Sequence, residues 1–428
     1  LAWLGCATWW LFISLHIYGG LAAPLAAITI FLFSAGLAIF YGAAAALYQW
    51  LCASKTSRAW RVAAFAALWT AAELIRGNLW TGFPWGAGGY AHVDGWARYW
   101  APWLGIYGIT ALSAALAMAM VAKVSVGQSW RQAWRSTVLC LGFLLTLAYL
   151  WLQSPLHRGV TDRSAATFKV SLLQGNIPQD LKFAQGVAQA LQSYGDALAR
   201  TDADLVVTPE TAIPLLPSQL PEGYWMGLKA RFDAGEQAAL IGMPLLMRDE
   251  SGHVQYGNAA VGLRPNTEPY QYIKHHLVPF GEFVPSMFQW FVRQLNIPLG
   301  EFMRGAPVQA SLHWKGERIA PNICYEDLFG EELARSFANP DDTPTLMVNM
   351  SNIAWFGNTI AIEQHLNISR MRALELGRPM LRATNTGATA WIDAHGVVQA
   401  RLPSATQGEL TVQVQGVHGP ITPYARWA

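Results

Sequence analysis

At the end of a predicted β-strand, Ile319–Cys324, the chain reads Pro321-Asn322-Ile323-Cys324-Tyr325-Glu326-Asp327. Of the 4 cysteines in the sequence, Cys324 is the only one in the polar C-terminal two-thirds. An unpaired thiol in a domain outside the cytoplasm is usually a liability. Its position at a strand end therefore indicates a chemical role, if this part of the chain lies outside the cytoplasm.

The chain divides into an apolar first third and a polar remainder. Between Leu1 and Ser54 the only Asp, Glu, Lys, Arg or His is His16, whereas charges recur from about Phe168 onward. With 428 residues, the chain is long enough for two domains. Only 13% of the residues are charged, and their uneven distribution predicts that one domain lies in lipid and the other in water. The net charge of +2 is small and no Lys/Arg run occurs, so nucleic acid is not an expected partner.

Five apolar runs approach the roughly 20 residues that cross a bilayer. They predict an α-helical transmembrane domain over residues 1–155, with spans at Leu1–Tyr18, Pro24–Tyr48, Val62–Ile75, Trp103–Ala122 and Thr137–Leu152. The third run is short and contains Glu73, with Arg76 directly after it, so it is either a short span inside the bundle or a re-entrant segment. Ionisable groups within a membrane indicate function by default. An ordinary Glu73–Arg76 pair near the interface is the alternative that we favour.

Basic residues in short loops orient the predicted bundle. Two loops carry them: Lys55, Arg58 and Arg61 in the first, and Lys123, Arg131 and Arg135 in the second. Both loops are therefore expected to be cytoplasmic. The fifth span then exits to the outside, and the chain after about Ser154 is predicted to be extracytoplasmic, with a linker at 156–168.

The polar part alternates short β-branched runs with helical stretches, which predicts an α/β sandwich over residues 169–416. The predicted strands are 170–173, 205–208, 239–242, 259–263, 319–324, 346–349, 381–384, 389–393 and 410–414. The predicted helices are 183–200, 225–234, 331–338 and 360–376. No Gly-rich phosphate loop of either nucleotide type occurs.

Three segments carry candidate chemistry. Glu210 follows the strand at 205–208, Lys274 lies in the stretch 272–285, and Cys324 ends its own strand. A carboxylate can take the thiol proton as the sulfur attacks a carbonyl, and a fixed ammonium can stabilise the resulting oxyanion. The same lysine would favour the thiolate. Together they form a sufficient set for acyl transfer, although each alone could be a turn carboxylate, a surface charge or a small buried side chain.

His275 and His276 raise the question of a metal. Adjacent residues in a strand point to opposite faces, and no second pair has metal-ligand spacing. We therefore expect no metal site.

Taken together, the three segments resemble the nitrilase superfamily, whose members use a Glu-Lys-Cys triad in an αββα sandwich. The sequence is more closely similar to the apolipoprotein N-acyltransferase family, bacterial inner-membrane enzymes that complete lipoprotein maturation. The similar stretches cover nearly the whole chain in order: 82–85 (Gly-Phe-Pro-Trp), 174–179, 209–214, 274–285, 323–326, 352–357, 370–375 and 422–426.

The resemblance implies roles for the residues at these positions. Glu210 would be the base, Lys274 the oxyanion stabiliser and Cys324 the nucleophile. It adds Glu282, a second carboxylate that would orient Lys274, with Tyr325 and Glu326 as supporting residues beside the nucleophile. From the residues alone, Glu282 could equally be a turn carboxylate.

Substrate-binding residues are expected at Phe183, where the family often has Trp, and at Trp355. Trp290 and Phe291 lie in the apolar stretch Phe283–Met303. This stretch is predicted to be a mobile lid that admits acyl chains; a packed core segment is the alternative.

The resemblance also implies a location. The family has eight spans, two before the stretch that begins here and one after Ala428, so the chain is expected to be truncated at both ends. Residues 417–428 would lead back toward the membrane. The protein would be a multi-pass protein of the bacterial inner membrane with a periplasmic catalytic domain.

The implied reaction has two steps. Cys324 takes a fatty acyl group from a phospholipid as a thioester, and the N-terminal amine of a diacylglyceryl-cysteine apolipoprotein then takes it as an amide. The expected partners are the phospholipid donor, the diacylated apolipoprotein and membrane lipid, with no cofactor. The alternatives are a membrane-anchored nitrilase-like amidase that hydrolyses a carbon–nitrogen bond and a non-enzymatic scaffold on a nitrilase fold.

Overall fold

A computed structural model describes residues 1–53, 56–124, 167–178, 185–248, 252, 254–285 and 302–428, together with scattered positions between 131 and 149. Its polar part contains two six-stranded sheets. The first has the order β12-β1-β2-β3-β4-β5, with strands Gly408–Val414, Phe168–Gln174, Leu205–Val207, Ala238–Arg248, Val254–Leu263 and Tyr270–Ile273. The second has the order β11-β10-β9-β8-β7-β6, with strands Val398–Arg401, Ala390–Ile392, Met380–Thr384, Leu346–Ser351, Glu317–Ile323 and Leu312–Trp314.

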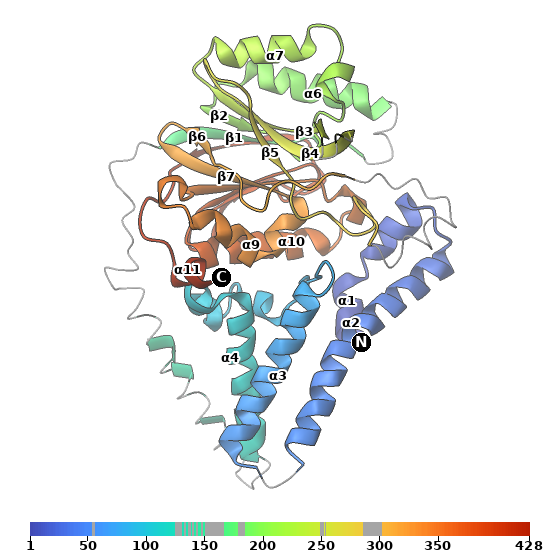
Figure 1. The fold of residues 1–428 in the computed structure, drawn as a ribbon, viewed down its shortest axis with the longest axis vertical. Coiled ribbons are helices and arrows are strands. Elements are labelled where there is room, and N and C mark those ends of the chain that lie inside the picture. Colours follow the sequence, from blue (N-terminus) through green and yellow to red (C-terminus); the bar gives the residue numbers. More distant parts are fainter. Residues whose placement is uncertain are drawn as a thin grey trace.

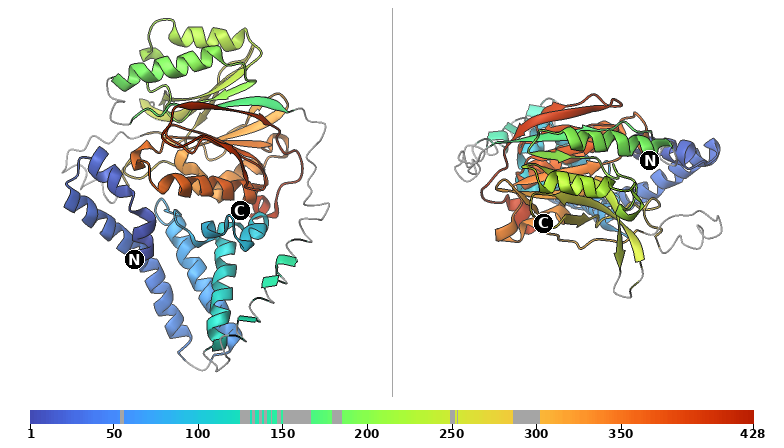
Figure 2. Two further views of the ribbon diagram at one scale, coloured as in Figure 1. Left: turned by 180° about the vertical axis from the view of Figure 1, so that it is seen from behind. Right: turned by 90° about the horizontal axis from the view of Figure 1, so that it is seen from above.

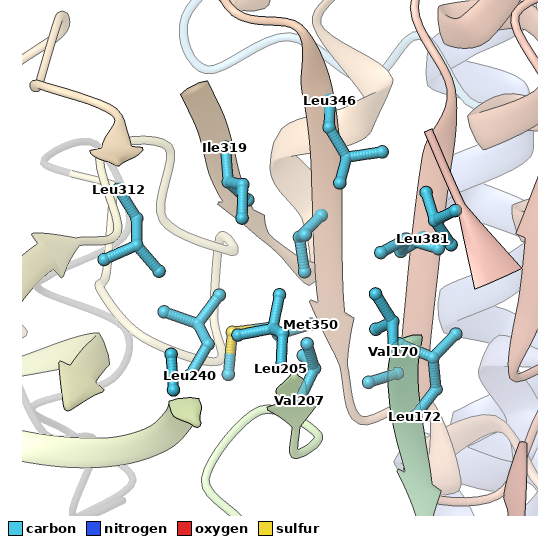
Figure 3. Packing of buried hydrophobic residues seen from close by; sticks show 14 of the residues in the cluster. Val170, Leu172, Leu205, Val207, Leu240, Leu312, Ile319, Leu346, Met350 and Leu381 are labelled. Carbon is cyan, nitrogen blue, oxygen red and sulfur yellow. The ribbon is translucent and has the colours of Figure 1, made fainter. Parts of the chain in front are cut away.

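The two sheets face each other and each carries helices on its outer side (Figure 1). Helices α6 (Gln185–Arg200) and α7 (Tyr224–Asp233) cover the first sheet, and α9 (Gly330–Ala334) and α10 (Ala361–Leu376) cover the second. Aliphatic side chains from both sheets meet between them, as Figure 3 shows for ten labelled residues. Alternate side chains of a strand point to opposite faces, so each sheet can pack against the other sheet and against its helices at once. The αββα sandwich expected from the sequence is confirmed.

The three strands that the sequence pattern missed are β5, β6 and β11, and all three lie at sheet edges. Edge strands are often short and partly solvated, so they lack the continuous apolar run of a buried parallel strand. Within β11, for example, Gln399 and Arg401 are exposed. The nine predicted strands all match observed ones, and the predicted helix 331–338 is α9 followed by a short 3-10 turn.

Helices from the first third lie on the α9–α10 side of the sandwich, in both views along the sheets (Figures 1 and 2). They are α1 (Ala2–Thr8), α2 (Ala23–Leu51), α3 (Arg58–Asn78) and α4 (Ala101–Val124). Two segments are long and apolar enough to cross a membrane, Ala23–Leu51 and Trp96–Ala122, and they contain the second and fourth predicted spans. The fifth predicted span falls mostly outside the described residues.

The first predicted span, Leu1–Tyr18, is not one regular helix. Helix α1 ends at Thr8, and a π-helix follows at Ile13–Tyr18. Between them the Trp10 side chain is buried, and its indole Nε1 donates to Gln364 Oε1 of α10 at 2.9 Å. This segment therefore docks on the sandwich, which a hydropathy pattern cannot reveal.

Glu73 and Arg76 of α3 are both buried, but they do not form the expected pair with each other. Glu73 accepts hydrogen bonds from Thr110 Oγ1 at 2.9 Å and from the Gly88 amide at 3.0 Å. Arg76 Nη1 donates to the carbonyl oxygens of Phe83 and Trp85, at 2.6 and 2.8 Å. Arg76 thus fixes the loop after α3, and the simple interface pair that we favoured is wrong.

Helix α10 also docks on α4 through buried charges. Glu375 Oε1 accepts the Ile106 amide at 2.6 Å, and Arg372 Nη2 lies 2.9 Å from Glu375 Oε2. The amide is free for this bond because α4 is kinked at Gly105, where φ is +61°. A Cβ at Gly105 would lie 2.2 Å from the Tyr424 ring of α11 (Pro423–Trp427), so only glycine fits there.

We expect Leu381→Ala to lower the melting temperature of the detergent-solubilised protein. Leu381 is fully buried between the sheets (Figure 3), and removing its side chain there should cost about 2–5 kcal/mol. Val397→Ala is the matched control because Val397 is 39% exposed, and its effect should stay within about 0.5 kcal/mol. Equal shifts for the two variants would contradict the assigned core.

Candidate active site

The structure brings Glu210, Lys274 and Cys324 together at one end of the sandwich. Glu210 follows β2, Lys274 follows β5 and Cys324 follows β7 directly. Strands β2 and β7 each run parallel to a neighbour, and ligands bind outside the carboxyl ends of such strands. The three sequence segments therefore meet because each ends a strand at the same edge of the facing sheets.

Lys274 lies between two carboxylates. Its Nζ is 3.2 Å from Glu210 Oε1 and 2.9 Å from Glu282 Oε1. The lysine side chain is 1% exposed, and the carboxylates are nearly buried. An isolated buried ammonium would be costly, so this pairing keeps the charge inside. Glu282 is thus a partner of Lys274, and not a solvated turn residue.

Asn258 of β4 completes this cluster. Its Nδ2 donates to Glu210 Oε1 at 2.8 Å and to Glu282 Oε1 at 2.9 Å. Backbone amides serve the other carboxylate oxygens: Asn352 N donates to Glu210 Oε2, and Val278 N to Glu282 Oε2. The sequence analysis missed Asn258, although an amide at the start of the apolar run 259–263 was a usable signal.

The charges set the ionisation of the site. Burial raises the pKa of Glu210, but Lys274 and the hydrogen bonds of Asn258 and Lys274 outweigh it, so the pKa is lowered. Burial lowers the pKa of Lys274, but the carboxylates of Glu210 and Glu282 reverse this and raise it. Glu210 is therefore an ionised carboxylate and Lys274 a fixed cation at neutral pH.

Cys324 is the first residue of a 3-10 turn and has φ of +53°. This left-handed conformation costs a non-glycine residue about 1–2 kcal/mol. Burial and the negative charge of Glu210 raise the pKa of the thiol to about 12, although Lys274 opposes them. Lys274 does favour the thiolate, as expected, but its effect is smaller than the combined effect of burial and Glu210. The thiol is therefore protonated at neutral pH.

Glu326 ties the Cys324 turn to the Lys274 strand. Its Oε2 accepts the Ile323 amide at 2.6 Å and the Tyr272 hydroxyl at 2.9 Å. Its Oε1 accepts the His275 amide at 2.6 Å. Glu326 therefore holds two of the three segments in register, without an observed contact to Cys324 Sγ.

Tyr325 contacts the helical domain. Its hydroxyl donates to the Gly82 carbonyl at 3.1 Å, within the Gly-Phe-Pro-Trp stretch after α3. Trp355 is 38% exposed, and its ring meets Tyr18 edge-on at 5.5 Å. It therefore lies where the sandwich contacts the N-terminal segment. Phe183, Trp290 and Phe291 lie outside the described residues.

The two adjacent histidines bond to separate partners. His275 Nδ1 lies 2.8 Å from the Gly305 carbonyl oxygen. His276 Nδ1 lies 3.0 Å from Glu332 Oε2, and its Nε2 lies 2.9 Å from the Thr81 carbonyl oxygen. Among the described residues, no group of three or more His, Cys, Asp or Glu side chains could hold a metal ion.

We expect Glu210→Gln to lower the pKa of the Cys324 thiol, because it removes the negative charge that disfavours the thiolate. Thiolate absorbance during a pH titration, with Cys324→Ala as the baseline, would measure the change. Glu282→Gln is the control: the same change near Lys274 should shift the thiol less. An unchanged or higher thiol pKa in Glu210→Gln would contradict the assigned electrostatics.

Comparisons with known proteins identify the family of the chain. Residues 169–419 match the carbon–nitrogen hydrolase family model, and residues 1–119 match the apolipoprotein N-acyltransferase N-terminal domain. The apolipoprotein N-acyltransferase of Verminephrobacter eiseniae is 52% identical over 100% of this chain and 81% of its own length. That of Ralstonia nicotianae is 46% identical over 100% of this chain and 79% of its own.

Among solved structures, an amidase from Nesterenkonia sp. superimposes with a TM-score of 0.45 at 18% identity, covering 63% of this chain and 95% of that one. The whole-length similarity at 52% identity determines the family. The chain belongs to the apolipoprotein N-acyltransferase family, within the nitrilase superfamily.

Proposed function

We propose that the chain N-acylates apolipoproteins through an acyl thioester on Cys324. The observation that carries the proposal is the buried cluster of Glu210, Lys274 and Cys324, in a sandwich whose α9–α10 side is covered by helices apolar enough to cross a membrane. Two lipid substrates can reach a site that is anchored at the bilayer. Family membership supports lipoprotein and lipid as the substrates.

In the first step, Cys324 Sγ attacks the ester carbonyl carbon of a phospholipid while Glu210 takes the thiol proton. The raised pKa of the thiol makes this proton transfer necessary at neutral pH. Lys274 Nζ stabilises the oxyanion. The intermediate then collapses to a thioester, and the lysophospholipid alcohol leaves with the proton from Glu210.

In the second step, the free N-terminal amine of the diacylated apolipoprotein attacks the thioester carbonyl. Glu210 takes a proton from the amine and returns it to the sulfur as the thiolate leaves. An amide forms, and the thiol is restored. One base therefore serves both half-reactions, which is the logic of covalent catalysis with two large substrates.

The protein is a membrane protein by family. We place the catalytic domain on the periplasmic side of the bacterial inner membrane, with several spans, because the basic residues of the first third gather in two short loops. Trp355 is proposed to contact substrate, since its exposed ring lies between the sandwich and the N-terminal segment. Phe183, Trp290 and Phe291 stay sequence-based proposals for acyl-chain contacts.

Incubation with phospholipid but no acceptor should add one fatty-acyl mass to Cys324. Hydroxylamine should remove it, and mass spectrometry of the intact protein and of the Cys324 peptide would detect it. Cys324→Ala should carry no adduct, and Glu210→Gln should lose it too despite its more acidic thiol, because the proton acceptor is gone. An adduct on another residue would refute the nucleophile.

An acyltransferase and a hydrolase differ in the fate of the acyl-enzyme when no acceptor amine is present. With labelled phospholipid and a diacylated lipopeptide, most label should appear as N-acyl amide on the lipopeptide. Acetylating the lipopeptide amine should leave the acyl-enzyme intact and release little free fatty acid, because a thioester in this buried site would be shielded from water. Equal release of fatty acid with and without the free amine would instead favour the amidase-like alternative.

A further inference from the structure

Behind the nucleophile lies a fully buried polar cluster that the reaction scheme does not use: Asp327, His365, Ser369 and Arg382. Asp327 follows Cys324 in the same turn, His365 and Ser369 lie on α10, and Arg382 lies on β9. Arg382 Nη1 is 3.1 Å from Asp327 Oδ2, and Ser369 contacts both. Burying such a polar network costs folding free energy unless each of its donors and acceptors has a hydrogen-bond partner. Its position next to Cys324 therefore suggests a role there.

His365 connects this cluster to the nucleophile. Its Nε2 lies 2.9 Å from Asp327 Oδ1 and 3.3 Å from the carbonyl oxygen of Cys324. Its Nδ1 lies 3.1 Å from Arg382 Nη2. A guanidinium can only donate, so Nδ1 must accept and the ring proton must sit on Nε2. Arg382 thereby fixes the tautomer in which His365 donates toward Asp327 and Cys324.

The turn that carries the thiol is therefore held on both sides of its strained residue. On one side, the Ile323 amide donates to Glu326. On the other, the Cys324 carbonyl accepts from His365 and from Asn349 Nδ2, the latter at 3.2 Å. The Cys324 carbonyl lies in the peptide plane that follows the residue, and the Ile323 amide lies one peptide plane before the one that precedes it. These two anchors limit the rotation of the backbone between them, which includes φ and ψ of Cys324, and so limit the direction in which the Cβ–Sγ bond leaves the turn.

The helical domain reaches the same histidine. The indole ring of Trp85, in the loop after α3, stacks on His365 with centroids 5.6 Å apart and planes 26° apart. Trp85 Nε1 also donates to the neighbouring Gln364 Oε1 at 2.8 Å. The loop itself is held by Arg76. An unbroken set of contacts thus runs from α3 to the backbone of Cys324.

We infer that His365 is a positioning residue for the nucleophile: its Nε2–H holds the Cys324 carbonyl, and Trp85 of the helical domain holds the His365 ring. His365 does not reach the reacting atoms. It acts on the rate of acylation by keeping Sγ aimed at the carbonyl carbon and within reach of Glu210. The inference rests on the proposed role of Cys324 but not on the identity of the acyl donor.

The test measures acylation of Cys324 in the full chain by a soluble short-chain p-nitrophenyl ester, followed by mass spectrometry of the Cys324 peptide. His365→Leu should slow acylation per active site by about 10²-fold, the loss expected for a displacement near 1 Å. The ester concentration at half-maximal rate should not change. His365→Gln should recover most of the rate, because the amide nitrogen of Gln can replace Nε2 as the donor.

The fraction of Cys324 that is acylated at the end of the reaction gives the fraction of protein with a folded site. Dividing the rate by this fraction separates an effect on positioning from an effect on stability. Leu198→Ala is the matched control: Leu198 is fully buried on α6, in the cluster on the outer side of the first sheet, which includes neither Cys324 nor His365. It should lower the melting temperature while the rate per site stays near that of the wild type. If His365→Leu yields no folded protein, Trp85→Leu supplies the measurement, and Trp85→Phe should be faster than Trp85→Leu.

A wild-type rate per site in His365→Leu, or in Trp85→Leu where that variant replaces it, would overturn the inference. So would a His365→Gln variant as slow as His365→Leu. If Trp85 acts through His365, the double Leu variant should be no slower than His365→Leu alone, and multiplied losses would overturn the role of Trp85. Acylation by the ester but not by phospholipid would refute the proposed donor and leave this inference standing.

Discussion

The site depends on burying one ammonium group, that of Lys274. An unpaired buried charge costs about 3–5 kcal/mol, so the fold must supply partners from several elements at once. Glu210 comes from the end of β2, Glu282 from the loop after β5, and Asn258 from β4. Each partner is correctly placed only if the first sheet is formed in its observed register. The same cluster that serves chemistry therefore ties the strand order of that sheet together.

This cluster also explains why the Cys324 thiol is protonated. Two carboxylates lie beside one ammonium, so the positive charge of Lys274 alone does not determine the pKa of the Cys324 thiol. Burial also raises this pKa, because it disfavours the charged thiolate. In the proposed reaction, a protonated thiol next to an ionised Glu210 reacts only when a carbonyl is in place to accept the sulfur as the proton leaves. A protonated thiol is also protected from indiscriminate oxidation, because the thiolate is the form that oxidises readily.

Much of this site was predictable from the sequence, because a strand end followed by a charged or nucleophilic residue is a local signal. Glu210 and Cys324 could be placed by this signal, and Lys274 could be placed from the stretch that contains it. Edge strands such as β5 could not be predicted, since a strand that pairs on one side only has a weak apolar pattern. Asn258, His365 and Arg382 were also missed, because their partners are distant in the sequence: Glu210 is 48 residues from Asn258, and Asp327 is 55 residues from Arg382. The break of the first predicted span at Trp10 has the same origin, a bond to Gln364 on α10.

The contacts between the two parts of the chain are more specific than those of a simple membrane anchor. An anchor needs only apolar length. Here, Trp10 and Trp85 both donate to Gln364, Glu375 accepts from a backbone amide of α4, and Tyr325 beside Cys324 donates to the Gly82 carbonyl. Each of these buried polar groups would be left unsatisfied if the helices moved away, at a cost of about 1–3 kcal/mol apiece. The helical domain and the sandwich should therefore move as one body near the site. Because Tyr325 directly follows Cys324 in the turn, the geometry at Cys324 then depends on the helices that contact the sandwich.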